Sequence, residues 1–381
     1  MSRPDVIYLD FNATAPVRPE AWAAMRPWLE GRGGNAASAH TAGRHARQAL
    51  EDARERVAAL LGAFPDEVIF TSGATEANNL AIFGLCGDPP GHMLSSSVEH
   101  PCVIEPLKQL AARGFTVEWL SVDANGVVLP GDLPADVRLV AVMLANHETG
   151  AVMPISQAAC GLSSAHYHTD AAQAVGKIPV HFHELGVTTL SASGHKFGGP
   201  PGIGTLLLAR GTALRPMLYG GHQQRGQRPG TEPVALAVGF AAALDAALGE
   251  RETTFARMLD LRRRFLDSLR HGAAPVVLNG PEENGLPHTL NLSFPGCRSD
   301  TLLMALDLAG VMCSTGSACS SGSLLPSPVL KAMGVSDERL HSAMRFSLGP
   351  CLSEADIDEA ASRIVRVVTR LREFGVATEA Q

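Results

Sequence analysis

The amino-acid sequence predicts an α/β fold, in which a large domain with a mainly parallel sheet is joined to a smaller α+β domain. Two observations support this prediction. Short β-rich runs alternate with helical patterns between residues 46 and 208, an order typical of a parallel sheet covered by helices. The length of 381 residues also suits two domains of ordinary size.

The spacing of apolar residues predicts each element. Residues 46–61 and 357–371 carry apolar side chains at intervals of three and four, which predicts amphipathic helices. Ser353 and Asp356 precede the second helix with the spacing of a capping box. The predicted strands of the sheet are Val68–Phe70, Leu139–Leu144 and Thr205–Leu208, and a helix is predicted at Thr75–Phe83.

A change of domain is predicted near residue 250. A helical pattern over 251–271 leads into a proline-containing turn, after which a β-α-β order follows. This order spans residues 289–294, 300–308 and 342–348. We therefore expect a large domain over 16–250, and a small α+β domain formed by 251–381 together with 1–15.

The composition excludes several classes of protein. A formal net charge of −7 argues against general nucleic-acid binding, which needs a basic surface. The longest apolar stretch, 233–249, is short and contains Asp245, so no membrane span is expected. The seven cysteines are scattered and odd in number, and the first residues lack the pattern of a signal peptide. Both features favour reduced thiols in the cytoplasm.

The first candidate site is the small-residue turn Thr71–Glu76, between a predicted strand and a predicted helix. Backbone N–H groups and the positive end of the helix dipole suit a phosphate at such a turn. Thr75 would add a hydroxyl. An ordinary N-cap by Ser72 or Thr75 accounts for the same residues.

The second candidate is Ser191–Lys196, which precedes the glycine- and proline-rich turn Gly198–Gly202. Desolvation of a lysine in a small, neutral segment lowers its pKa and lets it form a Schiff base with an aldehyde. Ser193 and His195 flank Lys196 as candidate phosphate donors. A loop lysine that reaches solvent is the alternative.

The third candidate is Asp170, at the end of a predicted strand. A buried carboxylate needs a cationic or N–H partner, and the protonated ring nitrogen of pyridoxal phosphate is one. His166, His168 and Asp170 would share one face of the strand, so a zinc or iron site is an alternative. No further cysteine or carboxylate cluster completes such a site, and we expect no metal.

The fourth candidate is Cys319, in the run of small polar residues Cys313–Leu324. A cysteine in a Gly/Ser-rich loop is accessible, which favours a nucleophile or a thiol carrier over a solvent-facing bystander. Cys313 lies six residues earlier, a spacing that matches no common metal motif, and we interpret it as a packing residue.

Three weaker signals accompany these sites. His100 follows a strand-like segment and is suited to stacking on a planar ring, although a lone histidine is more often structural. Asn146–Gly150 follows the Leu139–Leu144 strand, where ligand groups gather in α/β sheets. Arg345 lies on an apolar strand and needs an anion, either a substrate carboxylate or a structural Asp or Glu.

Together these segments supply a phosphate-binding helix start, a carboxylate for a ring nitrogen and a lysine for an aldehyde. They also supply an arginine for a carboxylate and an accessible thiol. This combination predicts a pyridoxal 5′-phosphate site for an amino acid, with a sulfur nucleophile beside it.

The same segments resemble the motifs of the NifS/IscS-type cysteine desulfurases, which are class V aminotransferase-family enzymes of pyridoxal-phosphate fold type I. Agreement of many motifs in one order is far more specific than any single motif. The matching segments are Ile7–Pro16, Phe70–Glu76, Glu99–His100, Asn146–Gly150, His168–Gln173, Ser193–Lys196, Arg225–Thr231, Ser314–Cys319 and Arg345–Gly349.

The resemblance implies a seven-stranded sheet in the large domain and a homodimer with its active sites near the subunit interface. It implies that Lys196 forms the Schiff base and carries the proton. It also implies that Asp170 holds the ring nitrogen, that His100 stacks on the ring and assists proton transfer, and that Cys319 forms the persulfide.

The remaining implied roles concern the other cofactor groups and the substrate. Gln173 and Asn146 would contact the region of the ring oxygen, and Arg345 and Asn35 would bind the substrate. The phosphate would be held by Ala74, Thr75, Ser193, His195 and, from the other subunit, Thr231.

The implied reaction removes sulfur from L-cysteine, releases L-alanine and leaves a persulfide on Cys319 for an acceptor protein. The residues around Cys319 resemble the long-loop group of the family, which implies direct delivery to acceptors. Iron–sulfur cluster assembly is one expected destination. The chain ends soon after its last predicted helix, where relatives that serve the iron–sulfur scaffold often carry a longer tail. Molybdenum-cofactor, thiamine, tRNA-thiolation and DNA-sulfur pathways therefore stay open.

Three residues depart from the usual family pattern: Gly199, Pro201 and His222. Two other functions fit part of the sequence. Another fold-type I enzyme, such as a selenocysteine lyase or an aminotransferase, is one, and an aminotransferase would not need Cys319. A sulfur-carrier subunit without turnover is the other, and it would not need Lys196.

Overall fold

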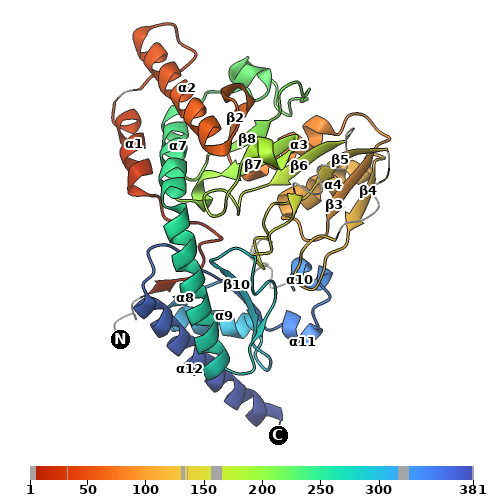
Figure 1. The fold of residues 1–381 in the computed structure, drawn as a ribbon, viewed down its shortest axis with the longest axis vertical. Coiled ribbons are helices and arrows are strands. Elements are labelled where there is room, and N and C mark those ends of the chain that lie inside the picture. Colours follow the sequence, from red (N-terminus) through yellow and green to blue (C-terminus); the bar gives the residue numbers. More distant parts are fainter. Residues whose placement is uncertain are drawn as a thin grey trace.

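The computed structural model describes residues 6–31, 33–129, 134, 136–155, 165–315 and 326–379, with side chains up to residue 373 of the last helix. The described chain forms two regions along its long axis (Figure 1). Helices α7 (Val234–Gly249) and α8 (Arg251–Gly272) run from one region to the other, with a single residue between them.

A seven-stranded sheet organises the upper region in Figure 1. Its strands, from one edge to the other, are β2 (Val68–Thr71), β8 (Gly204–Leu208), β7 (Thr189–Ser193), β6 (His166–Asp170), β5 (Val137–Ala141), β3 (His92–Ser96) and β4 (Thr116–Leu120). Neighbours from β7 to β4 are parallel, whereas β8 is antiparallel to both β7 and β2. The predicted α/β class with a mainly parallel sheet is thus confirmed.

The predicted strand Leu139–Leu144 ends three residues early, at Ala141. Beyond this point Val142 and Leu144 still donate backbone hydrogen bonds to His168 and Asp170 of β6. The apolar run therefore follows β6 as irregular chain, which explains why its composition predicted a longer strand.

Helices cover the sheet because each buries an apolar face against it or against a neighbouring helix. In α2, the buried positions Ala46, Leu50, Ala53 and Val57 repeat with helical spacing, and the helix ends at Gly62 with φ 64°. The helices of this region, besides α7, are α1 (Pro19–Leu29), α2 (Thr41–Leu61), α3 (Ala74–Leu85), α4 (Pro101–Ala112) and α6 (Phe182–Leu185).

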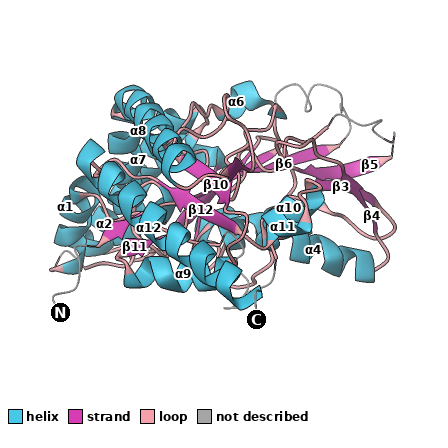
Figure 2. Cartoon of the chain, turned by 90° about the horizontal axis from the view of Figure 1, so that it is seen from below, coloured by secondary structure: helices cyan, strands magenta, loops and turns pink. Residues whose placement is uncertain are grey.

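The lower region contains an antiparallel sheet of order β12-β10-β9 and a parallel pair β1-β11, and Figure 2 shows it from below. The predicted capping box before the last helix is confirmed, since Ser353 and Asp356 exchange backbone–side-chain hydrogen bonds. Its elements, besides α8, are β1 (Ile7–Tyr8), β9 (Val277–Leu278), β10 (Thr289–Ser293), α9 (Ser299–Leu308), β11 (Val311–Met312), α10 (Pro328–Ala332), α11 (Asp337–Leu340), β12 (Ala343–Ser347) and α12 (Glu354–Glu379).

The two largest hydrophobic clusters correspond to these two regions. One is built on the large sheet and also takes in Leu330 and Ala343 from the C-terminal part. The other joins Ile7, Leu9 and Phe11 to side chains between Met258 and Val368. The N-terminal strand therefore packs with the C-terminal part, although the exact division at 16–250 against 1–15 with 251–381 stays a prediction. Among the described residues, no helix has both the length and the apolar character that a membrane crossing needs.

Candidate active site

The strand ends of the large sheet bring three of the predicted segments to one edge. Asp170 is the last residue of β6 and Ser193 the last of β7, and these strands run parallel. Gly204 at the start of β8 pairs with Ser193 on one side and with Thr71, the last residue of β2, on the other. The start of α3 therefore lies at the same edge as the carboxyl ends of β6 and β7, where ligands bind in α/β sheets.

The start of α3 forms a cradle of small residues. Its N-cap is Gly73, with no side-chain cap, so the ordinary N-cap by Ser72 or Thr75 is not formed. A Cβ at Gly204 would lie 2.6 Å from the Cα of Gly73, and a Cβ at Gly73 would lie 3.8 Å from Ser193 Oγ. An uncapped helix start near a serine hydroxyl suits an anion such as phosphate.

The Asp170 carboxylate is buried and held by neutral donors. Asn78 Nδ2 donates to Oδ2 at 2.7 Å, the Ala172 N–H donates to Oδ1 at 2.9 Å, and Ser191 Oγ lies 3.4 Å from Oδ1. No cation of the described residues forms a salt bridge with it. A buried carboxylate with this surrounding is suited to one cationic N–H from a ligand.

A chain of buried hydrogen bonds fixes the orientation of the Asn78 amide. Burial lowers the pKa of His168 to about 4, so its ring is neutral at neutral pH. Asn78 donates to Asp170 through Nδ2, so its Oδ1 accepts from His168 Nε2 at 2.9 Å. His168 Nδ1 then accepts from the Thr189 hydroxyl at 2.9 Å. The spacing of apolar residues gave no sign of Asn78, because its partners come from other strands.

These hydrogen bonds rule out the geometry expected for the alternative metal site. Both ring nitrogens of His168 are engaged by Thr189 and Asn78, so neither is directed at a shared ion with His166 and Asp170. Among the described residues, no group of three or more His, Cys, Asp or Glu side chains is arranged to hold a metal.

We expect Asn78→Ala to weaken retention of the ligand at Asp170. The change leaves the His168 N–H without its partner and leaves Asp170 Oδ2 with only Cys102 Sγ at 3.9 Å, at a cost of about 1–3 kcal/mol for each lost hydrogen bond. Cofactor loss on dialysis, followed by visible absorbance, should become at least about tenfold faster. Asn79→Ala is the matched control, since Asn79 donates to the Thr75 and Cys102 carbonyls instead. Equal cofactor loss in the two variants would contradict this role.

Lys196 lies on a short 3-10 turn, Gly194–Lys196, directly after β7. Its Nζ donates to the backbone carbonyls of Asn12 at 2.6 Å and Ala13 at 3.1 Å. The lysine is thus held inward by the N-terminal segment, contrary to the alternative of a loop lysine in solvent. Hydrogen bonds to two backbone carbonyls hold an amine that can be released to an aldehyde ligand.

His195, on the same turn, is half-buried, and its Nδ1 lies 3.3 Å from Thr14 Oγ1. Burial and the charges of Lys196 and Lys177 lower the pKa of His195 to about 4. A neutral ring at this place can donate one N–H to an anion.

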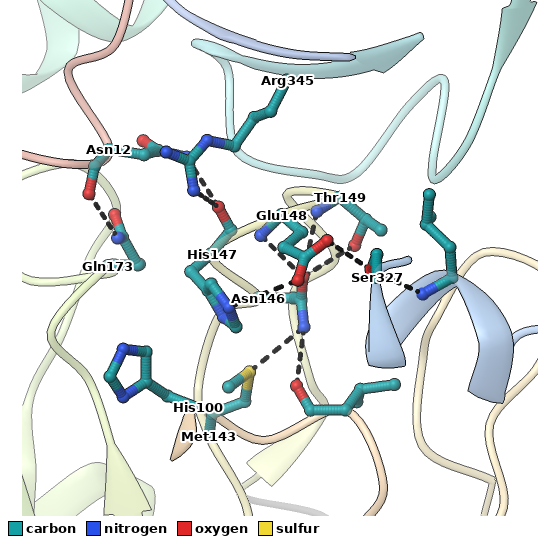
Figure 3. Close-up of polar contacts among 12 residues, drawn as sticks. Asn12, His100, Met143, Asn146, His147, Glu148, Thr149, Gln173, Ser327 and Arg345 are labelled. Atoms are coloured by element: carbon teal, nitrogen blue, oxygen red, sulfur yellow. Dashed lines mark hydrogen bonds and ion pairs between the residues drawn. The ribbon is translucent and has the colours of Figure 1, made fainter. Parts of the chain in front are cut away.

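His100 caps α4, since its Nδ1 accepts from the Cys102 N–H at 3.2 Å. Burial lowers its pKa, while the charge on Asp170 acts in the opposite direction. Its ring packs edge-on against His147 with centroids 5.2 Å apart, as Figure 3 shows. His100 therefore has the structural role expected of a lone histidine. It also lies close enough to Asp170 for the charge of that carboxylate to affect its pKa.

Arg345 is buried on β12 between two partners. Its guanidinium donates to Asp10 Oδ1 at 2.7 Å and to the His147 carbonyl at 3.2 Å, while its Nε has no partner. The structural carboxylate that the sequence left as an alternative is therefore present. A substrate carboxylate would share the guanidinium with Asp10, which a five-donor fork allows.

Figure 3 shows how the loop after β5 is held together. The Asn146 Oδ1 accepts from the Glu148 and Thr149 N–H groups, and its Nδ2 donates to the Val98 carbonyl at 2.9 Å. The second Nδ2 contact is to Met143 Sδ at 3.5 Å, a weak acceptor that a ligand oxygen would replace. Asn146 thus has a structural role in the loop, with one weak contact left for a ligand.

Asn12 is a central residue that the apolar spacing did not predict, although it lies within the Ile7–Pro16 motif. Its carbonyl accepts from both Lys196 Nζ and Gln173 Nε2, the latter at 3.0 Å. Its side chain donates to Thr289 at 2.9 Å and accepts from His288 at 2.9 Å. One buried residue therefore ties the N-terminal segment to the lysine, to Gln173 and to the lower region.

Three predicted site residues are not joined to this group. Asn35 is exposed, and its Oδ1 accepts from the nearby Ala37 N–H. Thr231 is exposed as well, at the end of the loop in which Arg228 pairs with Glu76 of α3 at 2.7 Å. Cys319 lies outside the described residues.

The family model for class-V aminotransferases matches residues 7–359. The chain belongs to this family. It is 42% identical over 375 residues to the cysteine desulfurase IscS of Dictyoglomus turgidum, a match that covers 96% of this chain and 95% of that protein. It is 39% identical over 380 residues to a human cysteine desulfurase, covering 97% of this chain and 83% of that one. Among solved structures, a NifS-like protein aligns with TM-score 0.89 at 33% identity, over 96% of this chain and all of that one.

Pyridoxal 5′-phosphate is the cofactor of this family, and the residues present fit it. The uncapped start of α3 beside Ser193 suits its phosphate, and the Asp170 carboxylate without a counter-cation suits its ring N–H. Lys196 supplies the amine for its aldehyde. Three separate chemical requirements are therefore met at one edge of one sheet.

Proposed function

We propose that this chain is a cysteine desulfurase, which removes the sulfur of L-cysteine, releases L-alanine and carries the sulfur as a persulfide on Cys319. The observation that carries the proposal is the convergence of Asp170, Lys196 and the α3 start at one sheet edge, next to the Arg345 guanidinium. The full-length relatives named cysteine desulfurase support it. A solved structure described as SspA in complex with cysteine, with TM-score 0.79 and 33% identity over 90% of this chain, supports cysteine as the substrate.

The proposed reaction divides its tasks among the residues of the site. The bound cofactor supplies an electron sink, which makes the Cα proton of the substrate acidic and weakens its Cβ–S bond. Arg345 orients the substrate carboxylate, and Lys196 takes the Cα proton and returns it. Burial lowers the pKa of His100 and so favours its neutral form. In that form it would stack on the cofactor ring and could accept a proton.

The sulfur transfer balances without an external oxidant. The Cys319 thiolate attacks the substrate sulfur, a new S–S bond forms and the Cβ–S bond breaks, as in thiol–disulfide exchange. The electron pair of the broken bond and a proton end on Cβ, which gives the methyl group of alanine. The sulfane sulfur on Cys319 then passes to an acceptor protein.

The acceptor and the assembly are part of the same proposal. The protein would be a homodimer in which exposed Thr231 completes the phosphate site of the second copy, and Asn35 stays a proposed substrate-binding residue. Iron–sulfur cluster assembly is the proposed destination of the sulfur, with other thio-cofactor pathways as alternatives. Cysteines 86, 102, 297, 313 and 351 are all free thiols, in keeping with a reducing cytoplasm.

The direct test is alanine formation from L-cysteine by the purified holoenzyme with dithiothreitol present. Stoichiometric alanine and sulfide would support desulfuration. A protein that carries its cofactor but forms pyruvate or a transaminated product in place of alanine would overturn the proposal and point to another reaction of the same fold.

We expect Arg345→Lys to raise KM for L-cysteine with a smaller change in kcat. A lysine keeps the charge but loses the fork that holds Asp10 and a substrate carboxylate together. Loss of one charge-assisted hydrogen bond costs about 1.5–3 kcal/mol, or about 10- to 100-fold in KM. Arg339→Lys, at an arginine that binds Asn279, is the control. An unchanged KM would show that Arg345 serves Asp10 alone.

A further inference from the structure

A cavity of about 270 Å³ lies beside the candidate active site and shares one residue with it, Lys196. Its walls come from the segment Phe11–Pro19, the junction of α7 and α8, and the residues around Leu348–Cys351. None of Asp170, Ser193, His195, Gln173 and Arg345 lines it. The cavity is therefore separate from these groups and borders the candidate site at Lys196.

The cavity walls are apolar with cationic groups set into them. The apolar side chains include Phe11, Phe197, Phe255, Met258 and Leu348. The titratable lining side chains, apart from the thiol of Cys351, are Arg18, Lys177, Lys196, Arg251 and His288. The described lining contains no aspartate or glutamate, so the charge that faces the cavity has one sign.

Two of these cations lack an anionic partner among the described residues. Lys177 Nζ donates a single hydrogen bond, to the neutral Gln173 Oε1 at 2.8 Å. Arg251 has no side-chain hydrogen bond or ion pair within the described part of the chain. By contrast, Arg18 pairs with Glu250 at 2.9 Å. A half-buried ammonium with two donors unused is a costly arrangement unless an anion completes it.

The groups around Lys177 disfavour its charged form. Burial lowers the pKa of Lys177 well below its usual value, and the charges of Lys196 and Arg345 lower it further. His195 and His288 also face it, and both have lowered pKa values. Without a ligand, Lys177 is biased toward the neutral amine.

We propose that this cavity binds a small amphipathic carboxylate, whose anionic head pairs with Lys177 and Arg251 and whose apolar tail lies against the aromatic walls. The ligand is a monocarboxylate with a short aliphatic or aromatic tail, because the charged groups of the lining are all cationic and the rest of its surface is mainly apolar. Occupancy would act on Gln173 through its hydrogen bond to Lys177, so the ligand would modulate the neighbouring cofactor site. The binding proposal holds whether or not the reaction is a desulfuration.

Isothermal titration of the holoenzyme with hexanoate tests the proposal. We expect hexanoate to bind, and hexanamide and acetate to bind at least about tenfold more weakly, because the first lacks the charge and the second lacks the tail. At mildly alkaline pH, binding should take up protons as Lys177 becomes charged, which is measured by repeating the titration in buffers of different ionisation enthalpy.

Variants of Lys177 separate an anion site from simple apolar binding. Lys177→Met should weaken hexanoate binding about 10- to 100-fold and abolish the proton uptake. Lys177→Arg, which is always charged, should bind hexanoate without taking up protons. Lys331→Met, at an exposed lysine, is the control, and thermal unfolding of each variant checks that it is folded. Equal binding of hexanoate and hexanamide, no binding to the wild type, or unchanged binding to Lys177→Met would each overturn the proposal.

Discussion

Replacing Lys196 by alanine is expected to abolish turnover of L-cysteine and the visible absorbance of the bound cofactor. The side chain supplies both the amine that joins the aldehyde and the base that moves the Cα proton, so both functions are lost when it is removed. We expect alanine formation to fall by about 10⁴-fold or more.

The structure adds a condition to this expectation. Lys196 Nζ is held by the carbonyls of Asn12 and Ala13, so removing it takes a donor from both, although the Asn12 carbonyl keeps its hydrogen bond from Gln173 Nε2. Lys196→Arg keeps a donor for these carbonyls but cannot form the Schiff base, and it should be equally inactive while unfolding at the temperature of the wild type. Lys331→Ala controls for loss of a lysine elsewhere. Activity above a hundredth of wild type in Lys196→Arg would remove Lys196 from the proposed role.

Much of the fold and part of the site could be predicted because the signals are local. The strand that ends at Thr71 is marked by a short apolar run, whereas those that end at Asp170 and Ser193 are marked by the small and polar residues of their motifs. In a parallel sheet these ends meet, so the sequence order alone indicates which motifs lie together. The family resemblance added roles that the spacing of residues did not contain.

The residues that were not predicted act through partners distant in the sequence. Asn78 lies 92 residues from Asp170, and Asn12 lies 277 residues from Thr289. A buried asparagine in an otherwise ordinary segment has no local pattern, because its role depends on which strand ends surround it after folding. The absence of an acidic partner for Lys177 was hidden for the same reason, since only the folded cavity shows that its described lining contains no carboxylate.

Replacing Cys319 by alanine is expected to separate cofactor chemistry from sulfur transfer. Cys319 is not among the residues proposed to contact the cofactor, so the variant should keep the visible absorbance and the spectral change on adding L-cysteine. Without the thiolate, the substrate sulfur has no acceptor on the enzyme. Alanine formation should therefore fall by at least about 100-fold, and no persulfide should be detected on the protein.

Cys313 offers a matched control for this variant. It lies six residues before Cys319, is half-buried, and burial raises the pKa of its thiol, which leaves little thiolate to act as a nucleophile. Cys313→Ala should consequently retain both alanine formation and the persulfide. If Cys319→Ala formed alanine as fast as the wild type, the sulfur would leave by another route, and the desulfurase proposal would have to be replaced by a lyase without a carrier thiol. If only Cys313→Ala lost the persulfide, the nucleophile would be assigned to Cys313. The transferred sulfur would be assigned to Cys319 if Cys313→Ala behaved as the wild type while Cys319→Ala kept the cofactor absorbance but was inactive.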